Sequence, residues 1–206
     1  MRKTSFAPAG FLMRRIASSR PPTSSRSARP NAAAATALEL GVPLVTVGEA
    51  LEGFGGAFGR VETIAVDGRR VSILLIKNPA GANEVLRTLT LEDGRLDLWM
   101  ALNDNIADGR DISWIWDADV EVLAGRVRRA TCAGTRAEEM ALRLKYAGIH
   151  AELDVERDLG RSLDSAVAAT DGGGRLFALP TYTALLELRK LLSARGLAPH
   201  YWQSGQ

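Results

Sequence analysis

The segment "VRRATCAGTRAEEMALRLKYAGIHAELDV", residues 127–155, decides the predicted fold because a strand, a helix and a second strand follow one another in it. Its two ends are short apolar stretches of the length typical of buried strands. In the middle, Met140, Leu144 and Ala147 stand at the helical spacing i, i+4 and i+7. Gly148 follows at the position where helices commonly end. The segment therefore predicts a unit of an α/β sheet.

The predicted helix in this segment has a second face and a recognisable start. Arg136, Glu139 and Arg143 line another face than the apolar positions. Thr135 is expected to be the N-cap, and Glu138 stands where a capping box needs an acid.

The same alternation extends along most of the chain, with Thr181 expected as the N-cap of the last helix. An Asp-Gly turn between two β-branched segments predicts a β-hairpin. The predicted strands are 61–66, 70–76, 96–102, 127–134, 149–155 and 175–180, and the predicted helices are 78–90, 135–148, 160–174 and 181–196. This order predicts an α/β fold with a mainly parallel sheet.

The amino-terminal quarter of the chain has a different composition. Residues 1–30 are rich in Arg, Ser and Pro and have no apolar periodicity, so we expect a disordered basic segment. An organellar transit peptide or a misassigned start codon would explain the same composition. Short helices are predicted at 31–41 and from Thr46 as N-cap, and a glycine-rich stretch places a domain boundary near Phe58. The expected units are therefore 1–30, 31–57 and 58–206.

The charge distribution and the cysteine content exclude several classes of protein. Residues 1–38 hold seven Lys or Arg and no acid, whereas the remainder holds 19 basic and 24 acidic residues. A net acidic domain does not favour nucleic-acid binding. Cys132 is the one cysteine, which excludes an internal disulfide and a cysteine zinc cage, and we expect it in the core. No apolar run approaches the about 20 residues that a transmembrane helix needs.

Three loops should meet at the carboxyl ends of the parallel strands, where α/β proteins bind ligands and partners. They are residues 77–81, 103–111 and 133–139. In the first, Lys77 and Asn78 precede a helix start and could contact a phosphate group. A capped helix beside a surface lysine explains the same residues, and both readings remain open.

The second loop lies in "ALNDNIADGRDISWIWDADVE", residues 101–121, which holds Asp104, Asp108, Asp111 and Asp117. A calcium-binding EF-hand is excluded, because isoleucine occupies its third and twelfth positions. No metal site is predicted. Aspartates commonly cap helices and close turns, so a structural role is one interpretation. The other is that an aspartate orients a catalytic histidine, which another protein would have to supply, because both histidines lie far along the chain.

Six motifs together resemble the carboxy-terminal domain of the Mur-ligase-like subunit of lipid II isoglutaminyl synthase, the MurT family. The resemblance covers about residues 31–206 and implies a Rossmann-like Mur ligase carboxy-terminal domain. The motifs are "FGR", "KNPAG", "NEVLRTL", "LNDNIADGRDISWIWDADVE", "GTRAEEMALRLKYAG" and "LPTYTALLELRKLL".

The resemblance implies a ligase in peptidoglycan synthesis that works as a heterodimer with a glutaminase subunit. ATP, with Mg²⁺, would activate the α-carboxylate of D-glutamate in the lipid II stem peptide, and ammonia from glutamine would convert it to isoglutamine. This work would take place at the cytoplasmic face of the bacterial plasma membrane.

The resemblance also assigns roles to single residues. Asp111, in the motif "DGRD", would complete the partner's Cys-His pair, and Asn31 would contact adenine. Lys77 and Asn78 would belong to the cofactor-binding residues. The implied partner interface consists of Asp104, Asn105, Asp108 and Arg110.

Two features of full family members are missing from this sequence. It has no GxxxxGK[ST] phosphate loop, and one cysteine cannot form the family's zinc ribbon. Residues 31–57 would be the remnant of the Mur ligase central domain. We therefore expect part of a ligase subunit that is inactive alone; the alternative is a non-catalytic glutaminase-docking module or an inactive truncated relic. A free-standing nucleotide-binding protein is disfavoured by the missing phosphate loop.

We predict that the purified chain neither hydrolyses ATP nor amidates lipid II, because it has no loop to hold the β- and γ-phosphates. Phosphate release measured with and without lipid II tests this. Steady, lipid II-dependent ATP turnover by contaminant-free protein would contradict the prediction.

Overall fold

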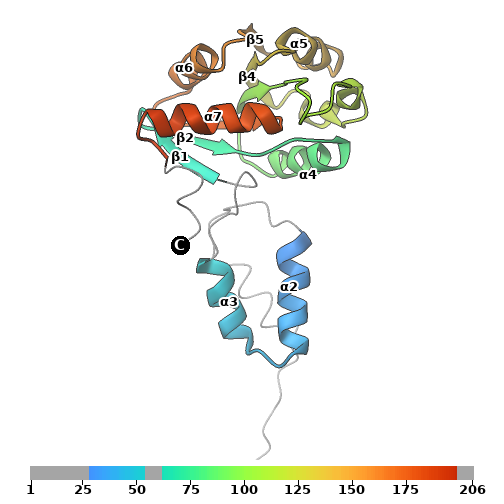
Figure 1. Cartoon of the computed structure of the whole chain (residues 1–206), viewed down its shortest axis with the longest axis vertical. Coiled ribbons are helices and arrows are strands. Elements are labelled where there is room, and N and C mark those ends of the chain that lie inside the picture. The colour runs from blue at the N-terminus through green and yellow to red at the C-terminus, as the bar shows by residue number, and fades with distance from the viewer. Residues whose placement is uncertain (1–27, 54–61, 199–206) are drawn as a thin grey trace, which may run out of the picture.

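The computed structural model describes residues 28–53 and 62–198 (Figure 1). The first described part is a pair of contacting helices, α2 (Ala28–Glu39) and α3 (Leu44–Gly53). Helix α2 begins three residues before the predicted start at Asn31. The predicted boundary near Phe58 and most of the basic segment lie outside the described residues.

The start of α3 differs from the expectation. Thr46 lies inside the helix, two residues after its first residue, and is therefore not the N-cap. Gly41, in contrast, has the positive φ of 84° expected just after a helix, which a residue with a side chain rarely adopts.

The predicted hairpin is present. Strands β1 (Glu62–Val66) and β2 (Arg69–Ile73) pair antiparallel around Asp67 and Gly68. Both turn residues have positive φ, 47° and 74°, which matches the twist of a two-residue hairpin.

The hairpin joins a mainly parallel sheet, as predicted, in the strand order β1-β2-β6-β3-β4-β5. Only β1 runs antiparallel to its neighbour. The other elements are α4 (Pro79–Thr90), β3 (Leu96–Ala101), the 3₁₀ helices η1 (Ser113–Trp116) and η2 (Val120–Leu123), β4 (Val127–Ala133), α5 (Ala137–Tyr146), β5 (Glu152–Val155), α6 (Leu159–Ala169), β6 (Arg175–Pro180) and α7 (Tyr182–Ala194). None of the described helices is long and apolar enough to cross a membrane.

Helices cover both faces of the sheet and form two apolar cores (Figure 1). Side chains of α4, α5, η1 and η2 pack on one face and form the first core. Those of α6 and α7 pack on the other face and form the second core. Cys132, on β4, is fully buried in the first core, as predicted, and burial raises the pKa of its thiol to about 12.

The position of β6 determines where the loops gather. This strand lies between β2 and β3, and the helix that follows it packs on the opposite face from the segments that follow its two neighbours. Adjacent strands whose connections leave on opposite faces open a crevice at their carboxyl ends. The crevice between β3 and β6 is therefore the expected place for a site.

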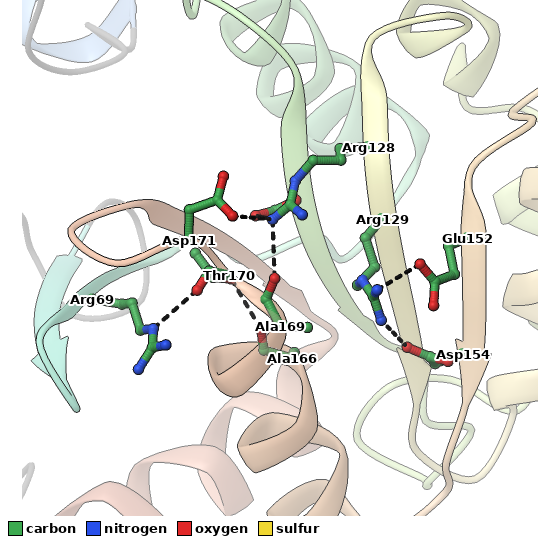
Figure 2. Close-up of polar contacts among 10 residues, drawn as sticks. Arg69, Arg128, Arg129, Glu152, Asp154, Ala166, Ala169, Thr170 and Asp171 are labelled. Carbon is green, nitrogen blue, oxygen red and sulfur yellow. Dashed lines mark hydrogen bonds and ion pairs between the residues drawn. The ribbon is translucent and has the colours of Figure 1, made fainter.

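At the other end of the strands, arginine side chains bond the end of α6 and the acids of β5 (Figure 2). Arg69 and Arg128 donate hydrogen bonds to the carbonyl oxygens of Thr170 and Ala169, respectively, at the end of α6, and each donor–acceptor distance is 3.0 Å. These cations oppose the partial negative charge of a helix carboxyl end. Arg129 on β4 forms ion pairs with both acids of the edge strand β5. The polar groups at this edge thus stabilise the fold.

One arginine of α5 is buried, contrary to the expectation that it lines a polar face. Arg143 is 3% exposed and donates hydrogen bonds to the carbonyl oxygens of Ile115 (2.9 Å) and Ala118 (2.7 Å). Its guanidinium also pairs with Glu121 and lies 5.4 Å from the ring centre of Trp116. Arg143 therefore fastens the long connection between β3 and β4 to α5.

We predict that Arg143→Met lowers the free energy of unfolding by about 2–4 kcal/mol, because two carbonyl groups lose their donor. Lys145→Met, at an exposed position of the same helix, is the matched control and should change it by less than about 0.5 kcal/mol. Urea denaturation of both variants measures the difference. Equal midpoints would show that Arg143 does not hold the connection.

Candidate functional site

The candidate site lies in the crevice between β3 and β6. A hollow of about 600 Å³ opens there between the loop that follows β3 and helix α7. Ile106 and Arg110 line it from the loop, and Leu186 and Lys190 line it from the helix. All four partner-interface residues predicted from the sequence belong to this loop.

Asn103 holds the base of the site together. It is 3% exposed and follows the last residues of β3. Its backbone N–H donates to the Thr181 hydroxyl (3.0 Å), and its amide donates to the Thr183 hydroxyl (3.0 Å). Its side-chain oxygen accepts the Thr135 N–H (3.0 Å). One buried side chain thus connects the segments that follow β3, β4 and β6.

Gly134 allows Asn103 to reach the neighbouring segment. A Cβ atom at Gly134 would lie 2.6 Å from Asn103 Oδ1 and 2.6 Å from the carbonyl oxygen of Leu102. The glycine also has φ of 90°, which disfavours any side chain. Both observations require glycine at this position.

Asp104 turns towards the α5 side of the site. It accepts hydrogen bonds from the Thr135 hydroxyl (2.8 Å) and from Arg136 Nε (2.8 Å). These two bonds hold the pKa of Asp104 below its ordinary value. The predicted capping box is therefore wrong: the N-cap residue is Arg136, and Thr135 instead donates its hydroxyl proton to Asp104. Glu138 pairs with Arg157.

Asp108 and Asn105 turn towards α7. Asp108 accepts the Thr183 backbone N–H (2.8 Å) and hydroxyl proton, and Asn105 donates to the same hydroxyl (2.9 Å). Thr181 is the N-cap residue by position, as predicted, but its hydroxyl accepts from Asn103 rather than from α7. A carboxylate from the loop therefore takes over part of the capping of α7.

Asp111 is the exposed carboxylate of the motif. Its Oδ1 accepts a hydrogen bond from the Ser113 N–H at a distance of 2.8 Å. The backbone N–H and the hydroxyl of Ser113 hold the pKa of Asp111 below its ordinary value, so the group is ionised at neutral pH. Arg110 and Asp117 are exposed as well.

Lys77 and Asn78, which were predicted to bind a cofactor, are not among the residues that line this hollow. Asn78 is the N-cap of α4 and accepts the Gly81 N–H (2.8 Å), as both interpretations of this loop expect. The Lys77 ammonium lies 5.5 Å from the ring centre of Tyr182. Asn31 belongs to α2, and its side chain lies outside the described part of the structure.

In the part of the chain that the structure describes, Asp111 forms no hydrogen bond with a histidine or a cysteine. His150 is exposed just beyond α5, and His200 falls outside the described residues. Across residues 28–53 and 62–198, no three His, Cys, Asp or Glu side chains gather as metal ligands would. The described part of the chain therefore offers a carboxylate without a local nucleophile or metal.

Comparison with known proteins now decides the family. Residues 75–185 match the family described as MurT ligase C-terminal. The chain belongs to this family. The match covers β3 to β6 and the loop that carries Asp111, so the family resemblance inferred from the sequence is confirmed.

Named relatives of this MurT-family chain agree. It is 37% identical over 156 residues to the MurT subunit of lipid II isoglutaminyl synthase (glutamine-hydrolyzing) from Staphylococcus aureus strain COL, which covers 75% of this chain and 35% of the relative. It is 34% identical over 165 residues to the subunit of the same name from Streptococcus pneumoniae strain R6, with coverages of 80% and 37%. The chain spans about a third of the length of these relatives.

Solved structures confirm the Mur ligase-like fold. UDP-N-acetylmuramate-alanine ligase MurC from Thermotoga maritima superposes with a TM-score of 0.54 at 15% identity, covering 79% of this chain and 35% of that one. MurF from Acinetobacter baumannii superposes with a TM-score of 0.53 at 22% identity, with coverages of 80% and 36%. At these identities the likeness concerns the fold.

The sequence reasoning missed Asn103 and Thr183, which make most of the polar contacts at the base of the site. A signal for Asn103 is present in the sequence, since a polar amide directly follows a fully apolar strand end. No local pattern distinguishes Thr183 from Thr181, because the partners of both lie about 80 residues away.

We predict that Gly134→Ala lowers the free energy of unfolding by about 2–4 kcal/mol, because its Cβ would displace Asn103. Gly125→Ala is the matched control: Gly125 also has positive φ, 73°, but a Cβ there meets open space. The control should lose about 1 kcal/mol from backbone strain alone. If urea denaturation gives both variants the same loss, close packing at Gly134 is not the constraint.

Proposed function

We propose that this chain is the carboxy-terminal part of the ligase subunit of a lipid II isoglutaminyl synthase, and that it completes the active site of a glutaminase subunit. The observation that carries the proposal is Asp111, an exposed, ionised carboxylate that directly follows Arg110, a residue lining the hollow. The named relatives, which are subunits of glutamine-hydrolysing synthases, support the choice of partner.

Asp111 would act on the partner's histidine. A carboxylate that accepts the Nδ1–H of an imidazole fixes its tautomer and stabilises the imidazolium that forms when a cysteine gives up its proton. This role requires a carboxylate that is ionised at neutral pH, as an exposed aspartate is, and the two hydrogen-bond donors of Ser113 lower the pKa of Asp111 further. It also requires exposure, because the histidine arrives with another subunit.

The neighbouring residues would form the docking surface. Ile106 is 82% exposed at the tip of the loop, and Arg110 stands beside Asp111. An exposed apolar side chain next to an arginine is a composition favoured in protein interfaces. Asp104, Asn105 and Asp108, also predicted as interface residues, bond mainly within the chain and would shape the surface rather than anchor the partner.

The residues present do not fit an ATP site by themselves. The amino terminus of α4 is already capped by Asn78, and Lys77 rests over the Tyr182 ring. We infer that ATP and Mg²⁺ are bound mainly by a part of the ligase subunit other than the described residues. The ligase would use them to amidate the D-glutamate α-carboxylate of lipid II with ammonia from the glutaminase, at the cytoplasmic face of the membrane.

We predict that Asp111→Asn reduces glutamine hydrolysis by the reconstituted pair by about 10² to 10³-fold, while folding and binding persist. The amide has nearly the same shape but lacks the charge that stabilises the imidazolium. Glutamine turnover at equal occupancy of the two subunits is the measurement. Asp117→Asn, a change at a second exposed aspartate of the same connection, is the matched control and should keep the wild-type rate.

Two outcomes would reject this assignment. Equal rates for wild type and Asp111→Asn at equal occupancy would mean that Asp111 only stabilises the turn at Ser113. Loss of binding without a change in the turnover of the residual complex would make it a docking residue.

A further inference from the structure

The hydroxyl of Thr183 forms hydrogen bonds with three side chains of the loop that follows β3. It accepts hydrogen bonds from the amides of Asn103 (3.0 Å) and Asn105 (2.9 Å), and it donates its proton to Asp108. A hydroxyl has one donor and two acceptor positions, so these three bonds use its full capacity. The backbone N–H of Thr183 adds a fourth bond, to the other oxygen of Asp108.

These bonds fix the part of the loop that leads to Asp111. Asn103, Asn105 and Asp108 precede it within eight residues, and Gly109, with φ of 87°, turns the chain out towards it. On the other side, Asp111 itself bonds the N–H of Ser113, where η1 begins. Asp111 is therefore held between two anchored points, one at Thr183 and one at η1.

The anchor at Thr183 is rigid for a physical reason. Thr183 is the second residue of α7, a helix of 13 residues whose apolar face is buried in the second core. The Asp108 carboxylate binds at the amino end of this helix, where N–H groups favour negative charge. Movement of the loop away from α7 would leave these N–H and hydroxyl groups without their acceptor.

We propose that Thr183 is a positioning residue that holds the Asp111 loop in the geometry required by the glutaminase subunit. The proposal rests on the function proposed above for Asp111. Catalytic groups displaced by about 1 Å lose on the order of 10²-fold in rate, so a hydroxyl that fixes the loop affects turnover without touching the reacting atoms.

The test compares Thr183→Val with Thr183→Ser in the reconstituted pair. Valine keeps the shape and the backbone N–H but removes the hydroxyl, and kcat for glutamine hydrolysis should fall about ten-fold with KM nearly unchanged. Serine keeps the hydroxyl and should restore kcat. Thr88→Val is the matched control, because the Thr88 hydroxyl donates to Glu84 within α4, away from the loop; it should keep the wild-type rate.

A double-mutant cycle separates this proposal from the one on Asp111. If Thr183 acts through Asp111, then Thr183→Val should have little further effect in the Asp111→Asn background. Should Asp111→Asn alone prove harmless, the proposed function itself fails. If Asp111→Asn is damaging while Thr183→Val retains wild-type kcat, or multiplies the loss in both backgrounds equally, the positioning role fails.

A second variant covers the case in which Thr183→Val does not fold. Asn105→Ala removes one of the three partners of the hydroxyl from an exposed position. Circular dichroism and the melting temperature should match wild type, and kcat should fall by a smaller factor than for valine. Unchanged kcat in folded Asn105→Ala would overturn the proposal.

Discussion

Strand β6 pairs with β2 on one side and with β3 on the other, and the carboxyl edge of the sheet depends on this double pairing. The residue after β6, Thr181, donates its backbone N–H to the carbonyl oxygen of Ala101, and its hydroxyl accepts the Asn103 N–H. Since β6 is the last strand along the described chain, these contacts link residues about 80 positions apart. The loop after β3 therefore acquires its final shape only when the carboxy-terminal strand and helix have docked.

The aspartates after β3 differ in function because they differ in surroundings. Asp104 is neutralised by Arg136, and Asp108 binds the amino end of a helix. Their charges are therefore compensated within the chain. Asp111 accepts hydrogen bonds from Ser113 and forms an ion pair with none of the described cations, and its exposed carboxylate therefore keeps its negative charge.

Features set by short-range geometry could be predicted from the sequence. Asp67 and Gly68 specify the hairpin turn, Asn78 and Pro79 specify the start of α4, and the alternation of apolar runs specifies the α/β class. Predictions failed where a distant group competes for a side chain. Thr135 has the local pattern of a cap but is used by Asp104. Arg143 was grouped with the charged side chains of Arg136 and Glu139, but it bonds a connection 25 to 28 residues away.

For the candidate site, the sequence predicted which loop forms it but not how the side chains of that loop are directed. The rule that loops gather at the carboxyl ends of parallel strands located the segment with Asp104, Asp108 and Asp111. It could not give the direction of each side chain, because that depends on the order of strands in the sheet. The insertion of β6 between β2 and β3 is not encoded in any local pattern, and Thr183 enters the site only through it.

The burial of Cys132 has a practical consequence. The thiolate is the form of cysteine that reacts with maleimides and iodoacetamides, and a thiol with a pKa of about 12 inside the first core presents almost none of it to reagents at neutral pH. Since the sequence contains no other cysteine, thiol reagents should label this folded chain very little at neutral pH. A fluorophore attached through a new cysteine on the exposed rim of the hollow would therefore report from that one place.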